Sequence, residues 1–392
     1  MQLKQVTNRK TGRQFHDVIR VIYKEDPYFV CPLDNNIESI FNPVKNAYFH
    51  NGDAIRWVLT DDMGNLIGRV AAFYNYAKAN KFDQRTGGLG FFECINNKEA
   101  AFLLFDACRQ WLLKAGMEAM DGPINFGEND SYWGLLVDGF ENPSYGMYYH
   151  KPYYKALFEE YGFKEYYEQI TNKIDLSRKF PERFWKIADW VRQKPGFSFE
   201  HFKKSRLDKY LNDVKEVYDQ AWVYHEHFTP LNKDVLKAEF IKAKHILDEE
   251  FIWFAYHDNN PIAFLVMIPD VNQLLKHFNG RLSLLDKLRF LRLKKKNLLT
   301  KARITVMGVV PRFQRYGIES AIFWYMDKMM QHKPNYKEIE LSWVGDFNPK
   351  MQRLHAAVEG TFSKKHITYR IIFDGRPVSK AHTIPSDPRV KK

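Results

Sequence analysis

The chain has 392 residues, of which 45% are apolar and 27% are charged, and Lys and Arg exceed Asp and Glu to give a net charge of +12. The length is that of two domains, and an apolar fraction near the globular average excludes a mainly disordered, collagenous or coiled-coil protein. The positive charge predicts an anionic partner and leaves nucleic acid, a phosphorylated cofactor and anionic lipid open.

Neither the cysteines nor the N-terminus indicates secretion. Cys31, Cys94 and Cys108 are odd in number and lack CxxC spacing, so we expect buried thiols rather than a disulfide framework or a zinc site. The first residues, MQLKQVTNRKTGRQ, lack the apolar core of a secretion signal. The longest apolar runs, such as 262–268, are far shorter than the roughly 20 residues that span a bilayer. We therefore expect a soluble, cytoplasmic protein that holds no metal.

In the first half of the chain, the apolar periodicity predicts an ordered series of helices and strands. Trp57 begins a strand, a polar turn follows around Asp62, and a second strand reaches Val70, which is the pattern of a β-hairpin. The predicted helices are 15–23, 98–114 and 152–161, and the further predicted strands are 89–94, 119–124 and 165–175.

A long segment rich in Gly, Pro and aromatic residues, 121–154, interrupts this half. Long loops inside compact domains are more often functional than idle. Aromatic side chains interleaved with Asn and Asp can line an apolar tunnel with a polar end. We predict that Asn125 and Tyr148 contact substrate, and a structured interdomain loop is the alternative.

The second half repeats this order of elements. Trp253 and the turn residue Asp258 reproduce the spacing of the first hairpin at an offset of 196 residues, and the glycine that ends a helix recurs at Gly162 and Gly360, an offset of 198. Two markers at nearly one offset indicate an internal duplication. The corresponding helices are 213–225, 320–330 and 349–358, and the further strands are 304–310, 338–343 and 368–373.

The duplication predicts an α+β fold of two tandem domains. Each domain has a mixed, mostly antiparallel sheet that is flanked by helices and closed by its own final strand. We place the N-terminal domain at 1–176, a proline-containing junction at 177–205 and the C-terminal domain at 206–392.

The second half also carries about two dozen extra residues, at about 271–303. Within 281–303, nine Lys and Arg oppose one acid, Asp286, so +8 of the net charge lies in this segment. Leucines recur there near helical spacing, which is typical of a basic amphipathic helix on a membrane surface. We predict contact with an anionic membrane through 281–303. A solvated helix over the domain seam and a patch for an anionic cofactor or nucleic acid are the alternatives.

The strand at 304–310 runs through a glycine-containing turn into the helix at 320–330. A helix N-terminus leaves backbone N–H groups unpaired and carries the positive end of the helix dipole, so such a turn is a ready site for an anion. The equivalent first-half turn, 95–97, has no glycine and no basic residue. We therefore predict a pyrophosphate site in the second half only, at this turn, where Gln314 and Arg315 add side-chain donors. The residues that we expect to bind the whole cofactor are Val309, Val310, Gln314, Arg315, Tyr316, Gly317, Ile318 and Ser320.

The pattern Gln314-x-x-Gly317-Ile318, after a strand that ends in Val-Val-Pro, resembles the coenzyme A loop of the GNAT acyltransferase superfamily. The order of strands agrees with that family in both halves, so the resemblance covers nearly the whole chain. It implies a tandem GNAT fold and acetyl-CoA or acyl-CoA as the co-substrate. Glu319 departs from the family, which usually has Gly or Ala there, and a carboxylate near a pyrophosphate should repel it.

The resemblance also implies catalytic and acceptor-binding residues. Glu340 lies on the strand where GNAT enzymes often carry a carboxylate that deprotonates the amine through water. The loop and helix that follow supply Asn348 and His355, the latter near the place of the family's general acid. Residues that contact the acceptor often lie at the end of the first helix, here His225 and Glu226. A solvated strand carboxylate, a packed histidine and a helix cap are the respective alternatives.

Together these features predict an acyl-CoA-dependent N-acyltransferase with a lipidic, sphingoid-like amine acceptor. The chain resembles the large GNAT-type enzymes proposed as bacterial ceramide synthases in its size, its tandem organisation and its Gly-Pro-x-Asn-Phe and Pro-x-Tyr-Tyr segments. We expect it in the cytoplasm, peripherally bound to the inner membrane. The alternatives are an acetyltransferase acting on a small amine, a protein or an aminoacyl substrate, and a non-catalytic protein that binds acyl-CoA or lipid. Because no groove-reading motif accompanies the basic cluster, we expect no nucleic-acid partner.

Overall fold

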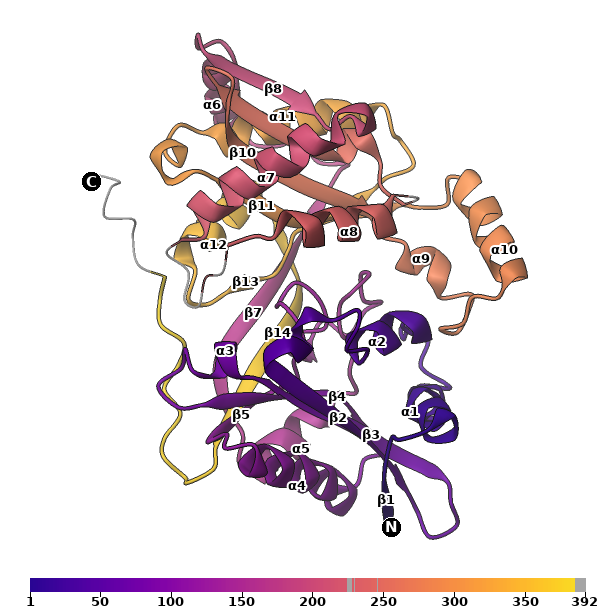
Figure 1. Cartoon of the computed structure of the whole chain (residues 1–392). Coiled ribbons are helices and arrows are strands. Elements are labelled where there is room, and N and C mark those ends of the chain that lie inside the picture. The colour runs from indigo at the N-terminus through magenta and orange to yellow at the C-terminus, as the bar shows by residue number, and fades with distance from the viewer. Residues whose placement is uncertain (224–227, 229, 245, 385–392) are drawn as a thin grey trace. The chain divides into compact units, whose positions relative to one another are not determined.

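The computed structural model describes residues 1–223, 228, 230–244 and 246–384. The chain forms two compact units, each assembled from separate segments (Figure 1). Unit 1 comprises 1–170, 272–293 and 364–381. Unit 2 comprises 171–271 and 294–363, together with the C-terminus from residue 382. The domain boundaries predicted at 176 and 206 were placed from the internal repeat of the sequence, and they stay a prediction.

Unit 1 is built on a mostly antiparallel sheet. Its strands are β1 (Gln2–Gln5), β2 (Gly52–Thr60), β3 (Leu66–Asn75), β4 (Thr86–Cys94), β5 (Ala119–Gly122), β6 (Leu135–Asp138), β7 (Lys164–Asp175) and β14 (Thr361–Ile372). They follow the order β1-β2-β3-β4-β5-β14-β7, and β6 also pairs with β14. The pairs from β1 to β4 and the pair β5–β14 are antiparallel, while β4 and β5 are parallel.

Helices cover both faces of this sheet because successive strand residues point to opposite sides. On β3, Val70 and Ala72 pack in one apolar cluster with α4 and α5, and Ala71 and Phe73 pack in another with α1 and α2 (Figure 1). The helices of unit 1 are α1 (Arg9–Ile22), α2 (Asp34–Ile40), η1 (Ala47–Asn51), α3 (Tyr76–Ala79), α4 (Lys98–Lys114), α5 (Tyr154–Tyr161) and α9 (Asn272–Leu275). Most of α10 (Leu284–Lys295) also belongs to unit 1, and its last two residues belong to unit 2.

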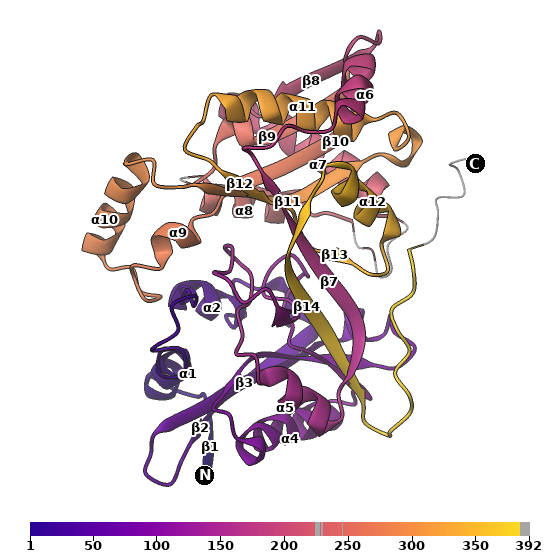
Figure 2. The same ribbon diagram turned by 180° about the vertical axis from the view of Figure 1, so that it is seen from behind.

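The last strand of the chain completes the sheet of the first unit. β14 lies between β5 and β7, and Figure 2 shows it beside β7. Arg370 of β14 forms a buried bidentate ion pair with Asp121 of β5, at 2.6 and 2.7 Å. Residues 173–175 at the end of β7 pair instead with β12 (Glu338–Glu340) in unit 2. The prediction that each half closes with its own final strand is therefore wrong. An alternating pattern identifies a strand but does not specify its partner.

Unit 2 contains the second mostly antiparallel sheet. Its strands are the end of β7, β8 (Phe197–His201), β9 (Ile252–His257), β10 (Asn260–Pro269), β11 (Lys301–Val309), β12 and β13 (Val344–Gly345). The order is β7-β12-β11-β10-β9-β8, with β11 and β12 parallel, and β13 also pairs with β7. Its helices are α6 (Glu182–Arg192), η2 (Lys204–Arg206), α7 (Leu207–Ala221), α8 (Lys233–Ala243), η3 (Glu249–Phe251), η4 (Pro311–Phe313), α11 (Ile318–Gln331) and α12 (Pro349–Ala357). Helices α6 and α11 pack side by side (Figure 2).

The predicted α+β class and the order of elements are confirmed in both halves. Helix α4 has the predicted bounds because Asn97 caps it, its Oδ1 accepting from the Ala100 N–H at 2.8 Å. The segment predicted as the junction, 177–205, contains α6 and β8. The three cysteines are buried and free, as predicted. Across the described residues, no helix has the length and apolar character needed to cross a bilayer.

Candidate functional site

The turn predicted to bind an anion lies between β11 and α11 in unit 2. β11 ends at Val309, and the Val310 N–H donates to the carbonyl oxygen of Ile262 in β10 at 2.8 Å. Gln314 Nε2 donates back to the Val309 carbonyl oxygen at 2.8 Å, and Gln314 Oε1 accepts from Lys350 Nζ. The Gln314 side chain therefore shapes the turn and also draws a lysine ammonium to it.

Gly317 caps the N-terminus of α11 with φ +74°, a left-handed conformation that is costly for any residue with a Cβ. A Cβ at this position would lie 2.3 Å from Cγ2 of Ile187 in α6. Backbone conformation and close packing therefore both require glycine here. The counterpart in unit 1 is Asn97, an extended residue whose side chain already occupies the helix N-terminus.

The first turn of α11 offers the backbone N–H groups of Ile318 and Ser320, because a helix N-terminus provides no intrahelical acceptor for them, whereas the Glu319 N–H donates to its own carboxyl. The side chains of Ile318 and Ser320 are buried, so these residues face a ligand through their backbone. The cationic and aromatic side chains exposed in the turn are those of Arg312, Arg315 and Tyr316. Unpaired N–H groups, the helix dipole and two guanidinium groups together favour an anion.

Glu319 is the acidic residue in this turn, and it is half-buried. Burial raises the pKa of its carboxyl to about 7, although a backbone N–H and the ammonium of Lys350 favour the charged form. Near pH 7 the carboxyl is therefore charged only part of the time. The repulsion of an anion expected from the sequence is correspondingly reduced, and it grows as the pH rises.

Glu340 is 4% exposed at the end of β12, and its Oε1 lies 3.5 Å from Nε of the buried Arg303 in β11. The parallel register pairs these two residues directly, and the same register position in unit 1 pairs Gly88 with Asp121. A buried carboxylate held by a guanidinium therefore occupies this place in both units. The alternative of a solvated strand residue is wrong, and the catalytic role of Glu340 stays a prediction.

His355 lies in α12 and is 5% exposed, with its Nδ1 3.1 Å from Asn172 Nδ2. Burial lowers the pKa of His355 to about 4, so the ring is neutral near pH 7. Because an amide NH₂ only donates, the ring proton is assigned to Nε2. Asn348 is the N-cap of α12, its Oδ1 accepting from the Met351 N–H at 3.2 Å. The catalytic roles of His355 and Asn348 stay predictions.

The predicted substrate residues Asn125 and Tyr148 are buried in unit 1. The Phe91 N–H donates to the Tyr148 hydroxyl at 3.0 Å, at a bulge of β4 where Phe91 has φ +53°. Tyr148 and Phe91 also line a pocket. Asn125 Oδ1 is buried, with no hydrogen-bond partner among the described residues.

The remaining predicted acceptor residues, His225 and Glu226, lie outside the described residues. Within the part of the chain that the structure describes, no group of three or more His, Cys, Asp or Glu is placed to hold a metal ion. The structure therefore divides the other predicted site residues in two. Asn125 and Tyr148 belong to unit 1, whereas the α11 turn, Glu340, Asn348 and His355 belong to unit 2.

Four contacts of the site were not predicted: Ile187 against Gly317, Lys350 on Gln314, Arg303 with Glu340 and Asn172 with His355. The pairing of Arg303 with Glu340 could have been predicted, because a charged residue in an otherwise apolar strand needs a partner of opposite charge when it is buried. Asn172 is 183 residues from His355 along the chain, and local sequence carries no signal for that pairing.

No family model matches the chain. Protein YghO of Escherichia coli (strain K12) is 25% identical in an alignment of 361 positions that covers 89% of this chain and 89% of that protein. The bacterial ceramide synthase of Caulobacter vibrioides (strain NA1000 / CB15N) is 27% identical in an alignment of 354 positions that covers 88% of this chain and 90% of that protein. A tandem GNAT protein from the clavulanic acid biosynthesis pathway superposes with a TM-score of 0.56 at 13% identity, over 94% of this chain and 98% of its own. The chain has the tandem GNAT fold, so the predicted resemblance is confirmed at the level of the fold.

Proposed function

We propose that this chain is an acyl-CoA-dependent N-acyltransferase, that unit 2 binds the acyl-CoA, and that the amine acceptor is a lipid reached at a membrane surface. The α11 turn carries the proposal, because left-handed Gly317, N–H groups without intrahelical acceptors and two exposed arginines suit a pyrophosphate. The relative from Caulobacter vibrioides carries the name bacterial ceramide synthase, which supports a lipidic acceptor.

In the proposed reaction, a neutral amine nitrogen attacks the thioester carbonyl carbon, the new N–C bond forms and the C–S bond breaks. One amine proton passes to Glu340, directly or through water. The backbone N–H of Val309 polarises the thioester carbonyl, because the Val310 N–H is already bonded to Ile262. His355, neutral near pH 7, donates a hydrogen bond from Nε2 to the leaving thiolate, which takes its proton from water.

The proposal is tested by thermal stabilisation with coenzyme A and with acyl-CoAs of increasing chain length. Mass spectrometry of a reaction with a long-chain amine then tests acyl transfer. We expect stabilisation by every acyl-CoA, larger for long chains, and an N-acylated product. Stabilisation by acetyl-CoA but by no longer chain would contradict the lipid part. No stabilisation by any of these ligands would contradict the acyl-CoA part.

Helix α10 supports the membrane part of the proposal. Leu284, Leu285, Leu288 and Leu291 are 80%, 77%, 60% and 47% exposed, and at 3.6 residues per turn they share one face. Phe290 points away from them, with its ring 6.3 Å from that of Phe278. The exposed cations of the helix and the residue after it are Lys287, Arg289, Arg292, Lys295 and Lys296. Exposed leucines and cations on one short helix supply both the apolar area and the charge that bind an anionic membrane surface.

The other basic residues of 281–303 include three with structural partners. Lys301 and Arg303 lie in β11 and pair with the carboxylates of β12. Arg281 pairs with Asp17 at 2.7 Å and with Asp34 at 3.4 Å. The charge predicted for the whole segment is therefore concentrated on α10, beside the leucines.

Replacing Gly317 with Ala should weaken coenzyme A binding about tenfold. A left-handed Cβ costs about 1–2 kcal/mol, and displacing Ile187 would shift the turn. The matched control is Gly64→Ala, because Gly64 has φ +86° but a Cβ there would meet no atom within 4 Å. Isothermal titration should show normal affinity in the control. Equal losses of affinity in the two variants would show that the α11 turn is not the site.

Replacing Glu319 with Gln should raise acyl-CoA affinity about three- to tenfold at pH 8 and less at pH 6. The reason is that the carboxyl, with a pKa of about 7, is mostly charged at pH 8 and mostly neutral at pH 6. The unmodified chain should therefore lose affinity as the pH rises, relative to the variant. Glu182→Gln, which changes an exposed glutamate on α6, is the control. An unchanged pH slope in E319Q would contradict this prediction.

A further inference from the structure

The end of α6 presents exposed apolar side chains beside the α11 turn of unit 2. Ile187, Trp190 and Tyr316 are 38%, 54% and 41% exposed, and no other tryptophan of the described residues is exposed. α6 lies against the turn, because a Cβ on Gly317 would lie 2.3 Å from Cγ2 of Ile187, and Trp190 follows Ile187 by about one helical turn. Exposed apolar side chains that gather in one place, unlike scattered ones, mark a contact surface.

Lys194, in the connection from α6 to β8, lies between the two aromatic rings. Its Nζ is 3.2 Å from the centroid of the Trp190 ring and 5.5 Å from that of the Tyr316 ring. The Tyr316 ring packs in turn against Phe313 and Phe197, with centroid distances of 5.6 and 6.2 Å. A residue from outside the turn therefore brings an ammonium to its border.

The charge of Lys194 is not neutralised within the part of the chain that the structure describes. Its ammonium has neither an ion-pair partner nor a hydrogen-bond acceptor there. The carboxylate of Asp189, on the same helix as Trp190, is paired with Arg192 at 2.9 Å. Because a lysine ammonium is a point charge on a flexible stem, it can move from an aromatic face to a phosphate oxygen.

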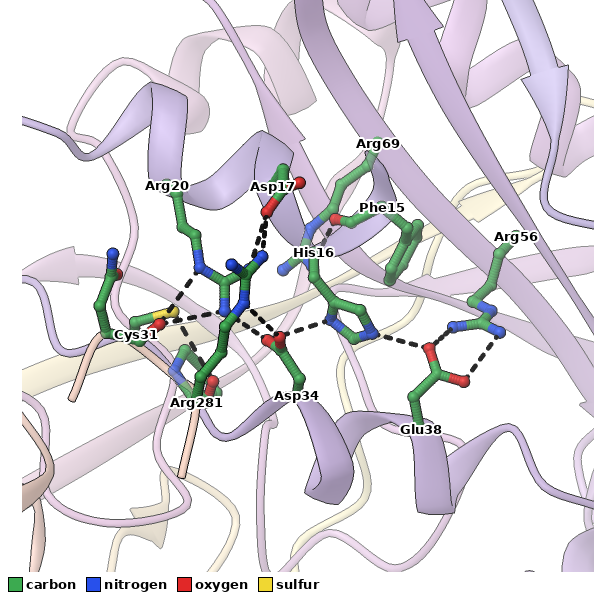
Figure 3. Close-up of polar contacts among 12 residues, drawn as sticks. Phe15, His16, Asp17, Arg20, Cys31, Asp34, Glu38, Arg56, Arg69 and Arg281 are labelled. Atoms are coloured by element: carbon green, nitrogen blue, oxygen red, sulfur yellow. Dashed lines mark hydrogen bonds and ion pairs between the residues drawn. The ribbon is translucent and has the colours of Figure 1, made fainter. Parts of the chain in front are cut away.

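Arg56 of unit 1 shows the opposite case. Its guanidinium carbon lies 5.1 Å from the ring centroid of Phe15, but Glu38 pairs with it at 2.6 Å (Figure 3). The Arg56 charge is therefore balanced inside the protein, and its position over the ring is a structural contact. The Lys194 charge has no such balance, so it remains available to an anionic ligand.

An exposed aromatic ring and an unpaired ammonium beside an anion-binding turn fit the nucleotide end of coenzyme A. In addition to the pyrophosphate, that end carries a purine base and a phosphate on the 3′ oxygen of the ribose. Nucleic-acid bases of any kind stack on aromatic side chains, and lysine binds phosphate through its charge. The phosphopantetheine arm of an acyl carrier protein has neither the base nor the 3′-phosphate.

We infer that Trp190 stacks on the adenine and Lys194 pairs with the 3′-phosphate, so that the acyl donor is a coenzyme A thioester and not a carrier-protein thioester. This assignment rests on the proposed function, because it extends the site at the α11 turn. Both residues precede β8 and all the other elements that form that turn, so the Gln314-x-x-Gly317 pattern does not include them.

The test is isothermal titration of the full chain with coenzyme A, 3′-dephospho-coenzyme A and 4′-phosphopantetheine. We expect coenzyme A to bind at least tenfold tighter than dephospho-coenzyme A, and phosphopantetheine to bind more weakly still. Lys194→Gln should lower the affinity for coenzyme A at least tenfold and change that for dephospho-coenzyme A less than threefold. Lys328→Gln is the matched control, because Lys328 lies 5.5 Å from the ring of Trp324 in the last turn of α11 and should not affect any of the three ligands.

Trp190 is tested by two variants. Trp190→Ala should weaken coenzyme A and dephospho-coenzyme A by the same factor, at least fivefold, because both ligands carry the base, and it should leave phosphopantetheine binding unchanged. Trp190→Phe keeps an aromatic face and should restore most of the lost affinity. Since Trp190 is exposed, both variants should retain the melting temperature of the unmodified chain.

Equal affinity of the unmodified chain for coenzyme A and dephospho-coenzyme A would overturn the inference without any variant having to fold. Equal losses for the two ligands in K194Q, unchanged affinities in W190A, or phosphopantetheine binding as tight as that of coenzyme A would also overturn it. Each of these results would leave coenzyme A binding, and so the proposed function, standing. No binding of coenzyme A to the unmodified chain would overturn both.

Discussion

Substituting Glu340 with Gln is expected to lower kcat by two to four orders of magnitude while acyl-CoA affinity stays within about twofold. The reason is that the proposed reaction requires a base for the amine proton, and loss of a general base typically costs that much. Gln keeps the shape of the side chain and removes its basicity. Steady-state kinetics with a long-chain amine, combined with acyl-CoA titration, measures both quantities.

The control for this variant comes from the duplication. Asp121→Asn removes the carboxylate at the same register position in unit 1, where it pairs with Arg370. Breaking either buried ion pair destabilises the fold by about 3–5 kcal/mol, so both variants should unfold more easily. Only E340Q should lose its rate while folded. If the two variants lose activity in proportion to their lost stability, Glu340 is structural and the base is another group.

The second large effect is expected for membrane binding. Changing Leu284, Leu285 and Leu288 together to Gln should weaken binding to vesicles that contain phosphatidylglycerol at least a hundredfold. Burying each leucine in the bilayer interface contributes about 1.5–3 kcal/mol at most, and these three side chains are largely exposed in the protein. Sedimentation with vesicles, at low and high salt, measures the partitioning.

Two controls separate the contributions of apolar area and charge. Leu103→Gln with Leu113→Gln removes two exposed leucines from α4 and should leave vesicle binding unchanged. Reversing Lys295 and Lys296 to Glu should weaken binding to anionic vesicles and leave binding to neutral vesicles unchanged. Full pelleting of the α10 leucine variant would remove the membrane part of the proposed function.

The local features of this molecule follow from local sequence. Helix α4 begins at Lys98 because an Asn cap precedes a continuous apolar stripe, and both are visible in the residues themselves. The turn at Gly317 is visible too, since a glycine between a strand and a helix indicates a left-handed cap. The helical leucine spacing likewise predicted α10, and the structure adds that its leucines are exposed.

The features that escaped prediction depend on distant residues. The partner of β14 is set by the total energy of strand pairing between segments about 250 residues apart, as in the Arg370–Asp121 pair. The neutral state of His355 depends on its burial beside Asn172, and the partly neutral state of Glu319 depends on local burial. Strand-pairing energies and pKa values depend on all the groups that surround a residue in the folded protein. The spacing of residues along the sequence does not reveal them.

The exchange of β7 and β14 also sets an order of events during synthesis. β5 cannot gain its antiparallel neighbour until residues 369–372 have been made, and Arg370, for example, follows its partner Asp121 by 249 residues. Until those residues have been made, β5 presents an unpaired strand edge. A fragment cut at the middle of the sequence repeat would lack this strand. Neither half of the sequence repeat therefore contains every strand of the unit 1 sheet.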